Sequence, residues 1–122
     1  MSRKESSKHE FIKQEIKKRP YLIGIDNVCF ATEEVALYDE KRRLQRMPDL
    51  LFLAEKLDER TEWILVEVKS RDKVTQYAKH QVEDARQYFL DHFGIDCKTI
   101  IAFMRKDGTI GWVQQTKGGK GW

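Results

Sequence analysis

The sequence predicts an α/β or α+β sandwich in which helices pack on a mixed sheet. Apolar residues recur at helical spacing in two segments and as strand-like runs elsewhere, so the expected order is helix, strands, helix, strand. Hydrophobic residues make up 40% of the chain and charged residues 35%, a balance typical of a folded protein with a charged surface. We therefore expect a single domain over residues 1–116, followed by a flexible glycine-rich tail at 117–122.

The first element that the sequence predicts is a helix over residues 8–19. Phe11, Ile12 and Ile16 cluster on one side of such a helix. Pro20 follows directly and cannot continue the helix, because it lacks a backbone N–H. We expect this apolar side to pack on the sheet.

The middle of the chain predicts several strands. Residues 21–31 are rich in aromatic and β-branched residues, whereas 33–45 alternate imperfectly and fit either a strand or an extended arm. A strand is expected at 47–55, and the polar loop at 55–62 can join it to an antiparallel neighbour. Residues 63–70 are nearly continuous in apolar character, which predicts a central strand that is covered on both faces.

A second helix is expected at residues 74–93. Its apolar positions recur at helical spacing, and Gly94 is placed to cap its end. Residues 99–115 then predict two short strands around a Lys-Asp-Gly turn. This segment would complete the sheet.

Several functional classes are disfavoured by the sequence. No apolar run approaches the roughly 20 residues that a membrane helix needs. The first ten residues contain no apolar signal region, so we expect a cytoplasmic protein. Cys29 and Cys97 are far apart in apolar settings, and we interpret both as buried free thiols. The histidines form no ligand spacing and are expected at the surface.

The distribution of charge favours a nucleic-acid partner more than the net charge of +3 does. Residues 1–19 carry seven Lys or Arg against three Glu. Such clusters can neutralise phosphates and release counterions, although each could equally be an ordinary solvated face. The further basic residues that we consider for nucleic-acid binding are Lys41, Arg42, Arg43, Arg46, Lys69, Arg71 and Lys73.

One acidic residue stands out among those that precede a lysine by two positions. Such pairs occur four times, where the composition predicts roughly two to three by chance, so their context must decide between them. Only Glu67 and Lys69 lie inside an apolar strand, where alternation points both to one face and Val66 and Val68 to the other. Two charges in such a strand carry a desolvation cost that is normally tolerated only if they pair or hold a metal.

Asp49 is the second carboxylate of the predicted site. It follows Pro48, and a hairpin through residues 54–61 can bring it beside Glu67. Two carboxylates and a strand carbonyl suffice for magnesium, which keeps several waters. Lys69 could then orient the attacking water or stabilise the developing negative charge. The competing interpretation is a salt-bridged trio at the end of a sheet.

These residues also carry a resemblance. The segments MPDLLFL and LVEVKS, followed by a helix containing a glutamine, resemble the PD-(D/E)XK nuclease superfamily, and in particular archaeal Holliday-junction resolvases and VRR-NUC nucleases. The resemblance spans roughly residues 8–105 and implies an αβββαβ restriction-endonuclease-like sandwich. It assigns the metal-binding acids to Asp49 and Glu67 and the catalytic lysine to Lys69.

Two further residues are carried over from the resemblance. These families place a glutamate on the first helix near the metal, and Glu15 falls between Phe11 and Ile12 on the predicted inward face, with Glu33 or Glu34 as alternatives. Gln81, twelve residues after Lys69, is expected to contact the site or the DNA backbone.

The expected function is a DNA endonuclease that uses Mg²⁺, with Mn²⁺ as a possible substitute. Branched or junction DNA in replication, recombination or repair is the expected substrate class. Paired cuts would require a homodimer, since one chain supplies one metal centre. The alternatives are a non-catalytic nucleic-acid-binding module and a nuclease-like subunit of a larger assembly.

Overall fold

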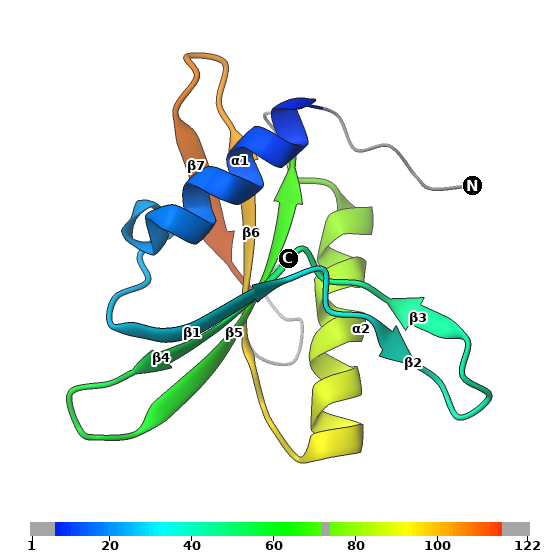
Figure 1. Ribbon diagram of the computed structural model, residues 1–122. Helices are drawn as coiled ribbons and strands as arrows, with labels where there is room; N and C mark the ends of the chain where they lie inside the picture. Colours follow the sequence, from blue (N-terminus) through cyan, green and yellow to red (C-terminus); the bar gives the residue numbers. More distant parts are fainter. Residues whose placement is uncertain (1–6, 72–73, 116–122) are drawn as a thin grey trace.

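The computed structural model describes residues 7–71 and 74–115 (Figure 1). Within these ranges the chain forms two α-helices, one 3-10 helix and seven strands. In chain order they are α1 (Ser7–Lys18), η1 (Pro20–Ile23), β1 (Val28–Glu33), β2 (Leu37–Tyr38), β3 (Leu44–Arg46), β4 (Leu50–Glu55), β5 (Thr61–Lys69), α2 (Gln76–Phe93), β6 (Lys98–Met104) and β7 (Ile110–Gln114). The expected tail at 117–122 lies outside the described residues.

Five of the strands form a mixed sheet in the order β1-β4-β5-β6-β7. The central strand β5 pairs antiparallel with β4 and parallel with β6, and the remaining pairs are antiparallel. A parallel pair needs a crossover connection, which α2 supplies. The strands β2 and β3 form a separate hairpin that extends beside α2 in Figure 1. The predicted sandwich with a mixed sheet is confirmed.

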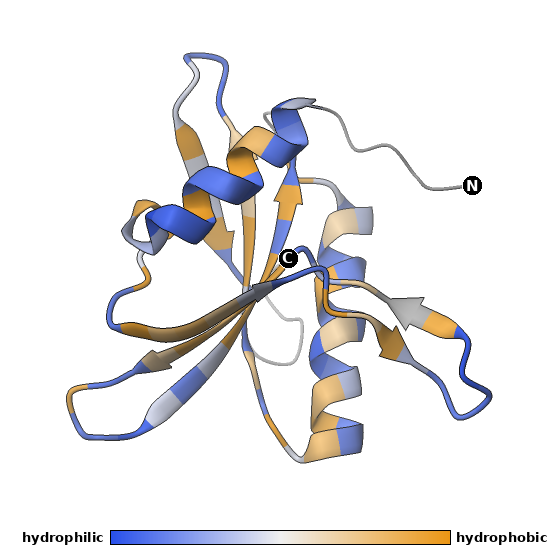
Figure 2. Cartoon of the chain, in the orientation of Figure 1, coloured by the Kyte–Doolittle hydropathy of each residue, from blue (hydrophilic) through white to orange (hydrophobic). Residues whose placement is uncertain are grey.

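The two helices cover opposite faces of the sheet, because neighbouring residues of a strand point to opposite sides. Val66 belongs to the core beneath α1, together with Ile12 and Ile16 of that helix. Leu65 belongs to the core beneath α2, where Val82 packs. Both helices carry hydrophobic and hydrophilic residues along their length (Figure 2), as expected when one side faces the sheet. The prediction that β5 is covered on both faces is confirmed.

Caps at both ends explain why α2 has these bounds. The hydroxyl of Thr75 accepts a hydrogen bond from the Ala78 N–H at 3.1 Å, which satisfies one of the free amides of the first turn. Gly94 adopts a left-handed conformation with φ of 67°, and its N–H donates to the Leu90 carbonyl at 3.1 Å. The predicted C-terminal cap is confirmed.

The prediction of a strand throughout residues 21–31 is wrong in its first half. Pro20 starts the 3-10 helix η1, Gly24 ends it with φ of 75°, and β1 begins only at Val28. A Cβ on Gly24 would lie 2.9 Å from the ring of Trp112, so the chain turns there against β7. For residues 33–45 the sequence fitted either a strand or an extended arm. In the structure most of this segment belongs to the hairpin of β2 and β3.

Three apolar residues are more exposed than we predicted. Phe11 is 54% exposed, because the inward positions of α1 are Ile12, Lys13 and Ile16. Phe93 ends α2 and is 58% exposed. Cys29 is exposed on the edge strand β1, whereas the free thiol of Cys97 is buried as predicted. No helix in the described part of the chain is long and apolar enough to cross a membrane.

Candidate active site

The candidate site lies where β4 begins and β5 ends. The hairpin register pairs Leu50 with Val66, so the preceding residue, Asp49, lies opposite Glu67. Since Val66 packs beneath α1, alternation places the side chains of Glu67 and Lys69 on the face that α2 covers. The geometry that we expected for the two acids and the lysine is therefore present.

Asp49 is buried, with only 4% of its surface exposed, and several hydrogen bonds hold its carboxyl group. Its Oδ2 accepts the Val68 N–H at 2.7 Å, and its Oδ1 lies 3.4 Å from His9 Nε2. Burial works against the charged form and on its own would raise the pKa of Asp49. Hydrogen bonds with His9, Glu67 and the Val68 amide outweigh burial, so the pKa of this carboxyl lies below its ordinary value. The site thus maintains a buried negative charge.

Lys69 is positioned by the first turns of α2. Its Nζ donates a hydrogen bond of 2.6 Å to Gln81 Oε1 and lies 5.8 Å from the ring centroid of Tyr77. A charged donor makes this bond stronger than a neutral amide pair. The cap at Thr75 fixes where α2 starts, and with it the turn that carries Gln81. The structure therefore brings Gln81 to the site, as we expected.

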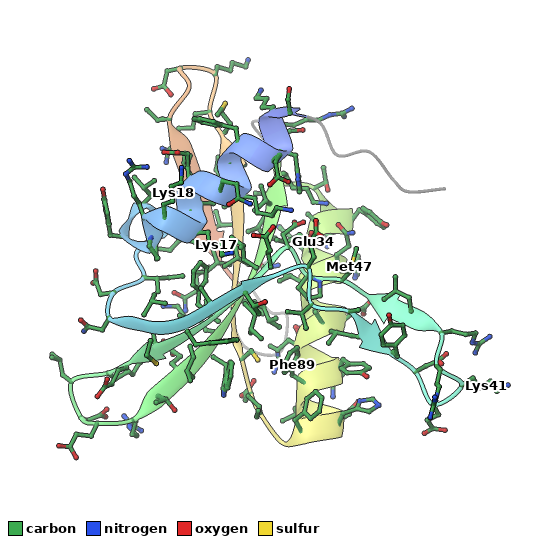
Figure 3. All side chains as sticks on the ribbon, in the orientation of Figure 1. Lys17, Lys18, Glu34, Lys41, Met47 and Phe89 are labelled. Atoms are coloured by element: carbon green, nitrogen blue, oxygen red, sulfur yellow. The ribbon has the colours of Figure 1, made fainter. Side chains whose placement is uncertain are left out.

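A buried lysine lies beside the site in the middle of an acidic cluster. Lys13 is fully buried, and its Nζ lies 2.8 Å from Glu34, 3.1 Å from Glu10 and 3.7 Å from Glu33. Figure 3 labels Glu34 near α1. The backbone N–H of Glu34 donates to the Asp49 carbonyl at 3.0 Å, so this cluster is joined directly to the start of β4.

The structure does not bring Glu15 to the carboxyl pair. Its carboxylate accepts a hydrogen bond of 2.7 Å from Arg19, one turn further along the chain. It lies outside the buried stripe of α1, and the α1 side chain that contacts Asp49 is that of His9. The alternatives Glu33 and Glu34 are engaged with Lys13. In residues 7–71 and 74–115, no three His, Cys, Asp or Glu side chains are grouped to hold a metal ion.

The basic residues predicted to bind nucleic acid are exposed in two places. Arg42 and Arg43 lie in the turn between β2 and β3, and Figure 3 labels their neighbour Lys41 at the tip of this hairpin. Arg71 lies just beyond β5. Lys73 lies outside the described residues. The turn is held by Asp39, whose Oδ1 accepts the N–H groups of Lys41 and Arg43 at 2.9 and 2.8 Å.

Two residues of this region, His9 and Lys13, were missed from the sequence. His9 was expected at the surface, and Lys13 was not considered. Both share a helical stripe with Ile12 and Ile16 at spacings of i, i+3, i+4 and i+7, which is the pattern of a buried face. Centring the inward face on this stripe would have found them.

Comparison with known proteins supports the fold. No protein-family model matches the chain, and no curated protein sequence matches it. A solved structure described as a repair endonuclease from Pyrococcus abyssi matches with a TM-score of 0.59 and 16% identity, covering 89% of this chain and 42% of that chain. The structure of EndoMS in apo form matches with a TM-score of 0.53 and 14% identity, covering 84% and 40%. The chain thus spans about two-fifths of each matched structure.

At these identities the similarity concerns the fold. The five-stranded mixed sheet between two helices is a restriction-endonuclease-like fold, and the two matched structures share it. The fold implied by the sequence resemblance is confirmed. The roles of the individual site residues stay predictions.

Proposed function

We propose that the chain is a metal-dependent DNA endonuclease that hydrolyses phosphodiester bonds, with Asp49, Glu67 and Lys69 as its reactive core. The observation that carries the proposal is the convergence of two adjacent carboxyl groups and one hydrogen-bonded lysine at the end of the central hairpin. Two carboxyl groups that share a hydrogen bond cannot both ionise without repulsion, and a cation bound between them would offset that repulsion. A plain salt bridge needs only one of them.

The donor set fits magnesium or manganese. Asp49 and Glu67 offer hard oxygen ligands, and Mg²⁺ is commonly held by one or two carboxylates while it keeps several waters. When bound, the ion would polarise the scissile phosphate and make a bound water easier to deprotonate. The low pKa of Asp49 favours cation binding, because this carboxyl is already ionised at neutral pH.

The surrounding side chains of the protein have separate tasks. The Lys69 ammonium has three N–H donors, and the one used by Gln81 leaves two that can reach a water or a phosphate oxygen. Those donors would stabilise negative charge as it develops in the transition state. The Val68 N–H holds Asp49 in place. A water attacks the phosphate directly, and no covalent enzyme intermediate forms.

DNA is the proposed partner, and branched or junction DNA is the proposed substrate class. The exposed cations Arg42, Arg43 and Arg71 can neutralise backbone phosphates without reading sequence. One of the structural neighbours is described as a repair endonuclease, which supports a substrate with damaged or branched strands. Cutting both strands would require two copies of this chain.

The proposal is tested by incubating the protein with linear, nicked, flap and junction DNA, with and without Mg²⁺ or Mn²⁺. Glu67→Gln should lower the cleavage rate by about 10²-fold or more. Glu62→Gln is the matched control, because Glu62 lies on the same strand and its carboxylate pairs with Lys56 at 3.4 Å. Its cleavage rate should equal that of the wild type.

The opposite result would select one of the alternatives. If the wild-type protein binds DNA but cuts none of the four substrates with either metal, the chain is a non-catalytic binding module or a subunit of a larger assembly. If Glu67→Gln cuts as fast as Glu62→Gln, the carboxyl pair is not the reactive site.

A further inference from the structure

A second group of cations surrounds a cavity beside the candidate active site. The cavity has a volume of about 380 Å³ and lies at the carboxyl ends of β5 and β6. Four basic residues line it, and no described acidic residue does. The polar lining residues are Lys8, Ser70, Arg71, Arg105 and Lys106, and we refer to this as the basic cavity.

Several residues that line the basic cavity are sequence neighbours of residues at the candidate active site. Ser70 and Arg71 directly follow Lys69, and Lys8 directly precedes His9, whose ring contacts Asp49. Fully extended chain spans about 3.3 Å per residue, so Arg71, which lies in the bend after β5, starts at most roughly 7 Å from Lys69. DNA advances about 3.4 Å per nucleotide along one strand, so the separation corresponds to at most about two nucleotides.

Three separate elements bring these cations together. They are the first turn of α1, the residues after β5 and the turn between β6 and β7, which Figure 1 shows at the same end of the sheet. The last of these turns is held in shape. The Arg105 N–H donates to the Thr109 carbonyl at 2.8 Å, and its guanidinium donates to the Ile110 carbonyl at 3.1 Å. The cavity wall is therefore formed before any ligand arrives.

The nearest acid in the turn, Asp107, is hydrogen-bonded within the turn itself. Asp107 accepts hydrogen bonds from the N–H and the hydroxyl of Thr109, at 3.0 and 2.6 Å. It is absent from the cavity lining. Cations from three elements line one space, and a multiply charged anion is attracted to such a lining. The Ser70 hydroxyl adds a neutral donor.

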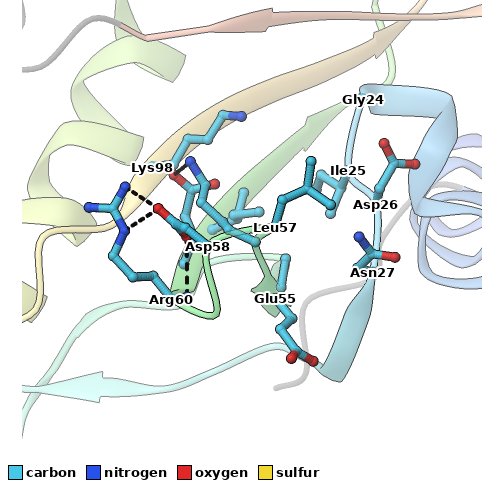
Figure 4. A pocket seen from close by; sticks show the side chains of 13 residues that line it. Gly24, Ile25, Asp26, Asn27, Glu55, Leu57, Asp58, Arg60 and Lys98 are labelled. Carbon is cyan, nitrogen blue, oxygen red and sulfur yellow. Dashed lines mark hydrogen bonds and ion pairs between the residues drawn. The ribbon is translucent and has the colours of Figure 1, made fainter.

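The cavity at the other end of the sheet provides a contrast. Figure 4 shows its lining, where Arg60 pairs with Asp58 at 2.6 Å and where Glu55, Asp26 and Lys98 also lie. Both signs of charge are present there, so this cavity has no preference for anions. The single sign of the basic cavity is therefore a local feature rather than a general property of the surface.

We propose that the basic cavity binds a second phosphate group of the DNA, distinct from the phosphate at which cleavage occurs. This inference rests on the proposed function and deepens it, because a fixed second phosphate sets which bond reaches Asp49 and Glu67. The bound group is either a terminal phosphomonoester or an internal phosphodiester. Both present the same oxygens to the cations.

The test measures binding in the Glu67→Gln background without divalent metal, so it does not depend on cleavage. The combined variant Lys8→Gln, Arg105→Gln and Lys106→Gln removes three cations of the cavity. The control Lys18→Gln, Lys56→Gln and Lys98→Gln removes three lysines elsewhere. Dissociation constants are measured over a range of salt for three DNAs of equal length: linear with 5′-phosphate ends, linear with hydroxyl ends, and circular.

The combined variant should bind DNA at least about tenfold more weakly than the control. The slope of its log affinity against log salt concentration should fall by about one, the amount expected for one lost phosphate contact. Loss confined to the 5′-phosphorylated DNA identifies a terminal monoester. Equal loss on all three DNAs identifies an internal diester. Affinities and salt slopes that match those of the control overturn the proposal. If the combined variant does not fold, Lys8→Gln alone, on the exposed first turn of α1, gives the same comparison with Lys18→Gln.

Discussion

The ammonium of Lys69 donates a 2.6 Å hydrogen bond to Gln81 Oε1, which joins the end of β5 to the second turn of α2. A free lysine side chain has four rotatable bonds and loses much rotamer freedom when it is immobilised. Here that loss is incurred on folding, before a substrate binds. The orientation of the lysine is therefore set before any substrate binds, which would favour the catalytic role that we propose for it.

Removing the acceptor of this bond should slow catalysis without weakening substrate binding. Gln81→Leu should lower kcat by about tenfold and leave KM nearly unchanged, whereas Lys69→Ala should cost 10²-fold or more. Gln81→Glu keeps an acceptor oxygen and should retain more activity than Gln81→Leu. The control is Gln87→Leu, since Gln87 is on the same helix and bonds the exposed Asp91. A tenfold rise in KM with constant kcat would instead assign Gln81 to DNA binding.

The two carboxylate variants should differ in stability. The lowered pKa of Asp49 means that the fold favours the charged form of this carboxyl. Such a group stabilises the protein above its unfolded pKa, and the contribution is lost as pH falls through the lower folded pKa. Asp49→Asn should therefore melt a few degrees below wild type at pH 7 without metal, and Glu67→Gln should not.

Thermal melting with and without magnesium checks this difference. Magnesium should raise the melting temperature of the wild type and raise it less in either variant, because each variant lacks one ligand. An equal magnesium-induced increase in all three proteins would exclude these carboxylates as the metal ligands. The salt-bridge interpretation would then replace the metal site.

The hairpin between β2 and β3 should contribute to DNA affinity without affecting sequence preference. Arg42→Gln, Arg43→Gln and Arg71→Gln should each weaken binding to all sequences about equally, and each should reduce the salt slope by about one. Arg60→Gln is the control, because Arg60 pairs with a neighbouring aspartate as Arg43 does, but lies at the far end of the sheet. Filter binding on several unrelated duplexes measures both quantities. Sequence-dependent losses would mean that these arginines contact bases.

A homodimer is predicted, with the last strands as its interface. We expect this interface to include Phe103, Ile110 and Trp112, which are aromatic and aliphatic residues of these strands. In the structure, β7 is an edge strand, and Trp112 and Val113 are partly exposed on it. Val113→Lys places a charge on this edge and should convert dimer to monomer without unfolding. Light scattering at tens of micromolar should give twice the chain mass for wild type, and a monomer there would exclude the dimer.

The two cysteines should differ in reactivity. Burial raises the pKa of the Cys97 thiol to about 12, with a further contribution from Asp96, so little thiolate forms at ordinary pH. Cys29 is exposed. Iodoacetamide at pH 8 should therefore modify one thiol in the native protein and two after denaturation, which mass spectrometry can count. Modification of Cys97 in the native state would show that the core around it opens readily.

The parts of the fold that were predicted correctly are those with strong periodicity. The run at 63–70 and the helix ending at Gly94 have patterns that only one element satisfies. The segment 21–31 failed because its aromatic and β-branched residues favour a strand, yet Pro20 and Gly24 impose a turn there. Local backbone constraints outweighed propensity at that point.

The candidate site likewise has parts that the sequence predicted and parts that it did not. Strand alternation and the hairpin placed Glu67, Lys69 and Asp49 correctly, because both rules are geometric. The first helix was misoriented by the apolar Phe11, which is exposed in the structure. A buried Lys13 violates the rule that charges lie outside. Two of the carboxylates that pair with it, Glu33 and Glu34, come from outside its helix, so the periodicity of that helix alone does not reveal them.

The hairpin register makes the site sensitive to insertions and deletions in a position-dependent way. One residue inserted between Trp63 and Glu67 would move the side chain of Glu67 to the opposite face of β5, although every residue type is retained. One residue inserted in the turn at 57–60 would leave the strand pairing intact, since Leu57 at its tip is almost fully solvent-exposed. Natural length variation in this protein should therefore accumulate in that turn. It should be excluded from residues 61–66, the part of β5 that precedes Glu67.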